Sequence, residues 1–190
     1  MSSNSELAVF FDRDGTITRM AGYVTRPGQR ETISGPAWCL VRLPHAGFRC
    51  ILVTNQSAVG RGMLTVDVLR EIHAELQRLL EAGGARLDAI YGCQLAPATD
   101  KETFIEHPDR KPGPGMLLRA AADLRINLSR SWMVADRLSD VPAGVNAGCR
   151  SIRVRTGHQY PDPAPPVSCD YVTLDSVREA ADYILAESDS

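Results

Sequence analysis

The 190-residue sequence contains no long apolar run and no strong excess of charge of either sign. No stretch approaches the roughly 20 apolar residues that a membrane span needs. The segment from Met1 to Glu6 lacks the basic start and apolar middle of a signal peptide, so we expect a cytoplasmic protein. A formal net charge of -2 lacks the basic surplus that is typical of nucleic-acid-binding proteins. These absences predict a protein whose main partner is neither a membrane nor a nucleic acid.

Cysteine is also scarce, and its residues are odd in number and widely spaced, at Cys39, Cys50, Cys93, Cys149 and Cys169. A domain held together by disulfides would carry an even, closely spaced set. The pattern therefore favours reduced thiols, as in the cytosol. Hydrophobic residues at 44% and charged residues at 23% are an ordinary globular balance. The length predicts a single domain that spans residues 1–190.

Short apolar segments alternate with amphipathic ones along the chain. We expect strands at 7–11, 50–54, 89–93, 132–135 and 151–154, and a weaker one at 171–172. Each is a continuous apolar run, as in strands that are buried on both faces. We expect helices over 36–46, between Thr65 and Gly83, after Pro114, and after a capping box of Ser176 and Glu179. This alternation predicts an α/β fold, a Rossmann-like parallel sheet with helices on both faces.

Acidic residues follow two of the predicted strands. Asp12 and Asp14 follow the first strand, and Asp136 and Asp140 follow the fourth. The carboxyl ends of parallel strands form one edge of the sheet, where ligands bind. Paired carboxylates repel each other unless a cation lies between them, and oxygen ligands suit Mg²⁺. Solvated turns are the alternative for these acids, and Asp140 can hold Lys111 or the metal's waters, or cap the helix that follows it.

Groups that can hold phosphate follow the second predicted strand and precede the helix that is expected after Pro114. The segment Thr54 to Ser57 offers a hydroxyl, amides and a backbone N–H, although such residues also form ordinary caps and turns. Lys111 precedes Pro112 and Gly113 just before a helix, where it can neutralise phosphoryl oxygens and a nucleophile together. A solvated basic turn is the alternative. The order of all these segments along one sheet edge favours a phosphate-handling site.

Four motifs resemble those of the haloacid dehalogenase superfamily, in its branch of heptose bisphosphate and histidinol phosphate phosphatases. They are Asp12-Arg13-Asp14-Gly15-Thr16, Thr54-Asn55-Gln56-Ser57, Arg110-Lys111-Pro112 and Pro114-Gly115-Met116. The resemblance runs from about Leu7 to Thr156. It implies a phosphoric monoester hydrolase in which Asp12 attacks the phosphoryl group and Asp14 protonates the leaving alcohol, then activates water. It further implies that Thr54 and Lys111 hold the transferring group.

The same resemblance implies the ligands of the site. Mg²⁺ would be bound by the Asp12 carboxylate, the Asp14 backbone carbonyl and Asp136. Substrate contacts would come from Arg13, Gly22, Tyr23, Asn55, Gln56, Ser57, Arg110 and Arg137. The implied substrate is a small phosphorylated sugar, D-glycero-D-manno-heptose 1,7-bisphosphate. An amino-alcohol phosphate, histidinol phosphate, is the alternative.

The sequence departs from the family pattern at two places. The family carries a zinc loop, Cys-x-His and then Cys-x-Cys before Arg-Lys-Pro. Here Cys93 has no histidine two residues later, and His107 and Asp109 stand in place of the second cysteine pair. Three remaining candidate ligands make a poor clamp, so we expect no zinc. Ala135 stands where the family usually has glycine.

The gaps between the first three predicted strands hold about one helix each, which leaves no length for a separate cap domain. We therefore expect an open site shaped by residues 18–29 and 94–110, and a monomer. Two further hypotheses are a signalling receiver domain and a phosphate-binding protein that has lost turnover. His45 and His73 lie in predicted helices and receive no functional role.

Overall fold

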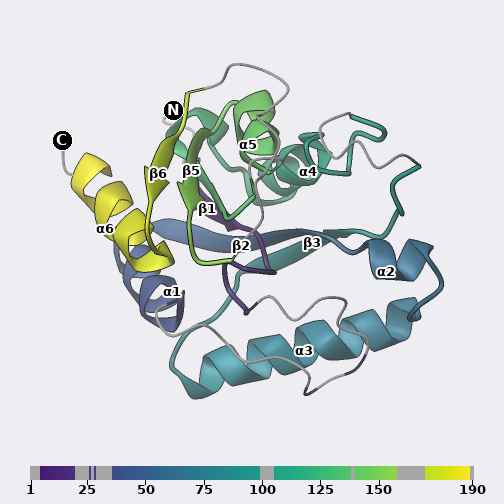
Figure 1. Ribbon diagram of the computed structural model, residues 1–190. Helices are drawn as coiled ribbons and strands as arrows, with labels where there is room; N and C mark the ends of the chain where they lie inside the picture. Colours follow the sequence, from purple (N-terminus) through teal and green to yellow (C-terminus); the bar gives the residue numbers. More distant parts are fainter. Residues whose placement is uncertain are drawn as a thin grey trace.

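The computed structural model describes residues 5–19, 26, 28, 36–98, 105–137, 140–157 and 170–188. Six strands form one sheet: β1 (Leu7–Phe11), β2 (Phe48–Asn55), β3 (Ala89–Cys93), β4 (Trp132–Ala135), β5 (Arg150–Val154) and β6 (Val172–Leu174). Their order across the sheet is β3-β2-β1-β4-β5-β6, and every neighbouring pair is parallel (Figure 1). The α/β fold class expected from the sequence is confirmed.

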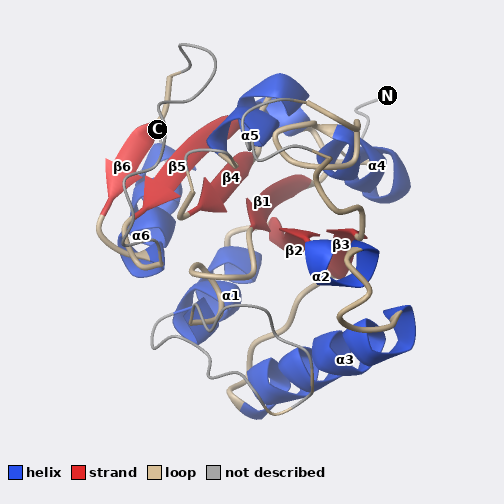
Figure 2. Cartoon of the chain, turned by 45° about the vertical axis from the view of Figure 1, so that its right-hand side comes forward, coloured by secondary structure: helices blue, strands red, loops and turns tan. Residues whose placement is uncertain are grey.

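Helices cover both faces of this sheet (Figure 2). The described helices are α1 (Pro36–His45), α2 (Ser57–Gly60), α3 (Val66–Ala82), α4 (Gly115–Leu124), α5 (Val141–Ala147) and α6 (Val177–Ser188), of which the short α2 packs on neither face. Helices α1, α3 and α6 pack on one face, and α4 and α5 pack on the other. A short 3-10 helix, Leu128–Arg130, precedes β4. None of the helices in the described ranges combines the length and apolar character that crossing a membrane requires.

The central strand β1 shows why the strands read as unbroken apolar runs. Val9 and Phe11 belong to the core on the α1 and α6 side, whereas Ala8 and Phe10 belong to the core on the α4 and α5 side. Successive side chains of a strand point to opposite faces, and both faces are covered here. All four residues are therefore buried. Burying each phenylalanine contributes about 1.5–3 kcal/mol.

The expected helix signals operate in part as predicted. Thr65 caps α3, since its hydroxyl accepts a hydrogen bond from Val68 N at 3.2 Å. At α6, the Ser176 hydroxyl accepts a hydrogen bond from Glu179 N at 3.2 Å, as a capping box requires. The Glu179 carboxylate accepts from Asp175 N at 3.1 Å, one residue before the N–H of Ser176 that a capping box uses. Strand β6 was expected at 171–172 and lies at Val172–Leu174. The four-residue α2 and the 3-10 helix are too short for periodicity to reveal.

Candidate active site

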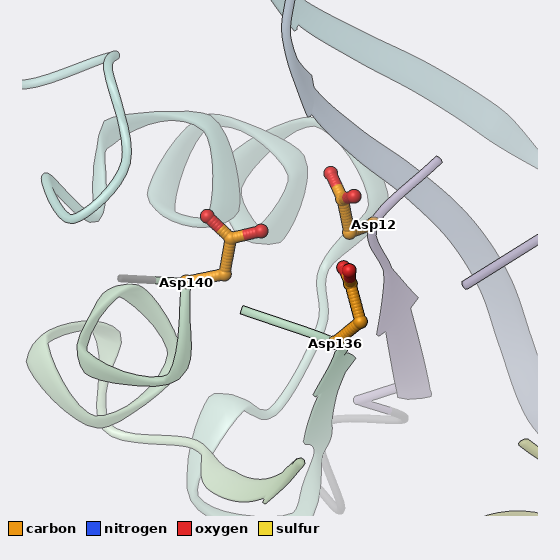
Figure 3. Close-up of side chains that lie close together, drawn as sticks. All are labelled: Asp12, Asp136 and Asp140. Atoms are coloured by element: carbon orange, nitrogen blue, oxygen red, sulfur yellow. The ribbon is translucent and has the colours of Figure 1, made fainter. Parts of the chain in front are cut away.

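Three carboxylates meet at the carboxyl edge of the sheet. Asp12 follows β1, Asp136 follows β4, and Asp140 precedes α5. All three are buried, and each offers one oxygen within 4.8 Å of the others. Figure 3 shows that the three side chains lie close together. A hydrogen bond from Asp12 N to Val134 O at 3.0 Å fixes the backbone of Asp12 beside β4.

The electrostatics of this cluster favour a cation. Burial, followed by the charges of Asp12 and Asp140, raises the pKa of Asp136 to about 8. Burial also raises the pKa of Asp140, although the charge of Lys111 opposes that rise. Within the cluster three buried carboxylates share the ammonium of Lys111, and the charge of Arg137 also acts on Asp136 and Asp140. An oxygen-binding divalent cation such as Mg²⁺ fits both the charge and the donor set.

Lys111 lies inside the cluster with its side chain almost fully buried. Its Nζ donates to Asp12 Oδ1 at 2.6 Å, to Asp140 Oδ2 at 2.9 Å and to Val53 O at 3.1 Å. Burial alone would lower the pKa of Lys111, but the two carboxylates outweigh it and the pKa lies above its usual value. An ammonium has three hydrogens. All three are therefore engaged, and Lys111 is a fixed positive charge next to Asp12.

Asp140 is held by Lys111 and does not cap α5. It occupies the N-cap position but makes no side-chain cap hydrogen bond. The capping alternative for Asp140 is wrong because the buried ammonium is a stronger partner for its carboxylate than a backbone N–H.

Asn55 joins the end of β2 to the loop that carries Lys111. Its Nδ2 donates to Lys111 O at 3.0 Å, and its Oδ1 accepts from Lys111 N at 3.1 Å. This pair of bonds uses both ends of the carboxamide. The side chain expected to contact substrate thus holds the backbone of Lys111.

Arg13 and Asp14 form an ion pair beside the cluster. Arg13 is 1% exposed, and the Asp14 side chain is 26% exposed. Arg13 Nε and Nη2 donate to the two Asp14 oxygens at 3.2 and 3.1 Å. Gln56 links this pair to β2, since its Oε1 accepts from Arg13 Nη2 at 2.6 Å and its Nε2 donates to Thr54 Oγ1 at 2.7 Å. The side chains of Arg13 and Gln56 are therefore engaged in orienting neighbours.

The remaining expected substrate contacts lie near this edge of the sheet or outside the described residues. Ser57 begins α2 and is half-buried. Arg110 is half-buried and donates from Nη1 to Leu95 O at 2.9 Å. Arg137 is half-buried, and its charge acts to lower the pKa of Asp136 and Asp140. Gly22 and Tyr23 lie outside the described residues.

The three candidate zinc ligands do not come together in the part of the chain that the structure describes. Asp109 Oδ2 accepts from Arg119 Nη1 at 2.6 Å. The ring of His107 accepts from Asp109 N at 3.1 Å. Cys93 is buried, and its burial raises the pKa of its thiol. An ion pair thus occupies Asp109 in this loop.

Sequence reasoning missed the last residues of β5 and the loop that follows it. Thr156 Oγ1 donates to Gly15 O at 2.7 Å, and Arg153 Nε donates to Asp136 O at 3.2 Å. A Cβ on Gly157 would collide with Asp136 Oδ2. The rule that ligands bind at the carboxyl ends of parallel strands could have identified this loop, because it follows a predicted strand.

Gly15 is required on two grounds. Its φ of +89° lies in the left-handed region that side chains disfavour. A Cβ there would also meet the carboxylate of Asp136. Glycine at this position lets β1 and β4 bring their acids into contact distance.

His73, which the sequence analysis left without a role, lies against the site from α3. Its Nε2 is 3.0 Å from Arg13 Nη1. The two residues are 60 positions apart in the chain. No local pattern reports such a contact, so the signal was absent from the sequence.

Known proteins resemble this chain along most of its length. A family model described as HAD-hydrolase-like matches residues 109–180. The D-glycero-D-manno-heptose-1,7-bisphosphate 7-phosphatase of Thermosynechococcus vestitus is 40% identical over 155 residues, which cover 79% of each chain. The protein of the same name from Chlorobaculum tepidum is 34% identical over 197 residues and 98% of each chain.

Solved structures agree with these relatives. The structure of D,D-heptose 1,7-bisphosphate phosphatase from B. bronchiseptica, complexed with magnesium and phosphate, has a TM-score of 0.80 and 27% identity. The match covers 95% of this chain and 99% of that one. A HAD-like phosphatase from Mesorhizobium loti has a TM-score of 0.81 and 28% identity, over 97% of this chain and 87% of that one. By sequence and by fold, this chain belongs to the haloacid dehalogenase-like hydrolases, in their heptose bisphosphate phosphatase branch.

Proposed function

We propose that this chain is a Mg²⁺-dependent phosphatase that transfers the phosphoryl group of a small phosphomonoester to Asp12 and then to water. One observation carries the proposal: a buried lysine and three buried carboxylates converge at the carboxyl edge of a parallel sheet. A carboxylate held against a fixed ammonium is suited to attack a phosphoryl group, whose negative oxygens the ammonium attracts.

The side chains divide the work as follows. Asp12 Oδ is the nucleophile, and Lys111 and the Thr54 hydroxyl hold the phosphoryl oxygens. Asp14 donates a proton to the leaving alcohol oxygen, and the resulting carboxylate then takes a proton from the water that hydrolyses the acyl phosphate. Asp12, Asp136 and the Asp14 carbonyl would hold Mg²⁺, which supplies positive charge where the phosphoryl oxygens gather. Asp140 keeps Lys111 in place.

The proposed substrate is D-glycero-D-manno-heptose 1,7-bisphosphate. Support comes from the relatives named above, which are named for this substrate and match over most of their length. A bisphosphate carries a second phosphate that needs a cation of its own. Arg110, directly before Lys111, is a half-buried cation of the right charge.

The first experiment is a phosphate-release assay on purified protein with Mg²⁺. Its panel holds the heptose bisphosphate, other sugar phosphates and histidinol phosphate. We expect the heptose bisphosphate to give the highest kcat/KM. A higher value for histidinol phosphate would overturn the substrate assignment. A stable phosphoprotein would favour a receiver domain, and binding without release would favour a phosphate-binding protein.

A substitution tests the nucleophile. Asp12→Asn keeps the shape of the side chain and removes the attacking oxyanion, so turnover should fall by more than about a thousandfold with the fold retained. Circular dichroism checks the fold. Retention of a tenth of the wild-type rate would refute the assignment of Asp12.

We also infer one domain with an open site, a monomer and a cytoplasmic location. Between β1 and β2, residues 12–47 include the ten-residue α1, which leaves too little chain for a second folded domain. The four described cysteines are free thiols, which suits a reducing compartment. Sedimentation of the purified protein would test the oligomeric state.

A further inference from the structure

His73 contacts the site through a buried arginine. Its ring Nε2 lies 3.0 Å from Arg13 Nη1, and His73 itself is half-buried on α3. A guanidinium carries donors only, so Nε2 must be the acceptor. The histidine ring is therefore neutral in this contact, with its proton on Nδ1.

Arg13 is held from three sides. One edge of the guanidinium, Nε and Nη2, faces the two oxygens of Asp14. Nη2 also reaches Gln56 Oε1, and Nη1 reaches His73. Burial lowers the pKa of Arg13 to about 10, against the opposing charge of Asp12, so the group stays charged at neutral pH. Its paired bonds to Asp14 are directional, because both partners are planar.

The other described contacts of the Asp14 carboxylate are longer. Thr18 Oγ1 lies 3.3 Å from Asp14 Oδ1, and Gln56 Nε2 lies 3.4 Å from Asp14 Oδ2. Arg13 therefore makes the two shortest of these four contacts and contributes to the direction in which the Asp14 oxygens point. Loss of the acceptor at Nη1 would leave a buried N–H without its partner. A buried N–H without an acceptor is unfavourable, so we expect the guanidinium to turn toward a new acceptor.

We propose that His73 is a positioning residue, which fixes the angle of the Arg13 guanidinium and through it the direction of the Asp14 carboxylate. This inference rests on the proposed function, in which Asp14 transfers the protons. His73 does not touch the reacting atoms. It supports the acid and base of the reaction from the opposite side of Arg13.

Two variants of equal length test the contact. His73→Gln places a carbonyl oxygen close to the former position of Nε2, and His73→Met fills the same space without a comparable acceptor. Both residues favour helices, so α3 should persist. His73→Asn, whose carbonyl falls short of Arg13, provides a second loss variant. His45→Met, at the exposed end of α1, is the control for substituting a histidine in a helix.

The assay compares two substrates with Mg²⁺: p-nitrophenyl phosphate, whose leaving group departs without a proton, and an alkyl phosphate, whose leaving group needs one. We expect His73→Met and His73→Asn to lose about tenfold in kcat/KM on the alkyl ester and less than about twofold on the aryl ester. His73→Gln should recover most of the loss. His45→Met should match the wild type on both.

Some outcomes would contradict the role of His73 alone, and one would contradict the proposed function as well. Equal losses on both esters, or no loss on either, would overturn the positioning role. The same holds if His73→Gln behaves like His73→Met. A wild-type protein that hydrolyses neither ester, nor the phosphorylated sugars, would refute the proposed function and this inference with it. Thermal melting of every variant separates unfolding from a lost contact.

Discussion

Two glycines leave the space that the Asp136 carboxylate occupies. Gly15 follows β1 and Gly157 follows β5, and a Cβ on either would collide with Asp136 Oδ2. The side-chain hydroxyl of Thr156, the residue before Gly157, also donates a hydrogen bond to the backbone carbonyl of Gly15. The position of this carboxylate therefore depends on residues that carry no side chain.

Gly157→Ala should weaken Mg²⁺ activation. The new methyl group must push Asp136 or the Thr156 loop aside, so we expect the Mg²⁺ concentration for half-maximal activity to rise about tenfold. Titration of activity with Mg²⁺ measures it. Gly92→Ala is the matched control, since its Cβ would meet only Thr54 O at 3.9 Å. An unchanged Mg²⁺ requirement in the Gly157 variant would show that the loop yields without cost.

For single residues, the sequence predicted the position of those that directly follow a strand. It did not predict contacts between residues that are far apart in the chain. Asp12 and Asp136 could be predicted as neighbours because both follow buried parallel strands. The roles of Asn55 and Gln56 in holding Lys111 and Arg13 could not, because a carboxamide suits a substrate as well as a backbone. The contact of His73 depends on the packing of α3, which no local pattern encodes.

Among the elements, β2 and the loop before α4 are joined by Asn55. That residue bonds both the N–H and the C=O of Lys111. Since α4 packs on one face of the sheet and β2 lies within it, this bridge fixes where the loop crosses the edge. The position of the Lys111 ammonium therefore depends on the contact between β2 and the loop before α4.

Asn55→Ala should lower kcat more than it raises KM. Displacement of Lys111 by about 1 Å can cost on the order of 100-fold in rate, whereas loss of a substrate contact would appear mainly in KM. Steady-state kinetics on the preferred substrate separate the two. Gln77→Ala is the control, because it removes a side-chain amide that accepts from Leu87 N before β3. A change confined to KM would contradict this role and favour a direct contact between Asn55 and the substrate.

Element positions were largely predictable, because each strand is a continuous apolar run and each long helix has a cap or stop. The boundaries of β1, β3 and β4 agree with the sequence, and β2 extends beyond its prediction at both ends. Phe48 and Asn55 lie outside the apolar run that defined the prediction. Their pairing with β1 and β3 depends on neighbours in the sheet, which propensity does not report.

For the molecule as a whole, the acidic cluster links stability to pH and to metal. In metal-free protein the pKa of Asp136 is about 8, because of burial and then the charges of Asp12 and Asp140. In an unfolded chain an aspartate has a pKa of about 3.9. Between these values the folded state holds a proton that the unfolded state has released. The free energy of unfolding therefore falls as pH rises through this window.

We expect the melting temperature in EDTA to fall between about pH 5 and about pH 8, and Mg²⁺ to raise it most at the upper end. At that pH a proton on Asp136 competes least with the metal. Scanning calorimetry with and without Mg²⁺ gives both trends. Asp136→Asn should flatten both, since its side chain neither titrates nor carries charge. A melting temperature in EDTA that rises with pH would contradict the electrostatic account of the cluster.

The saturated ammonium of Lys111 has a consequence for how a ligand arrives. Its three hydrogens already serve two carboxylates and a carbonyl. An incoming oxygen can bind only by exchange, taking the place of one resident acceptor. Weak acceptors such as sugar hydroxyls lose that competition, and a dianionic phosphate wins it. We therefore expect Lys111 to favour ligands whose oxygens carry a strong negative charge.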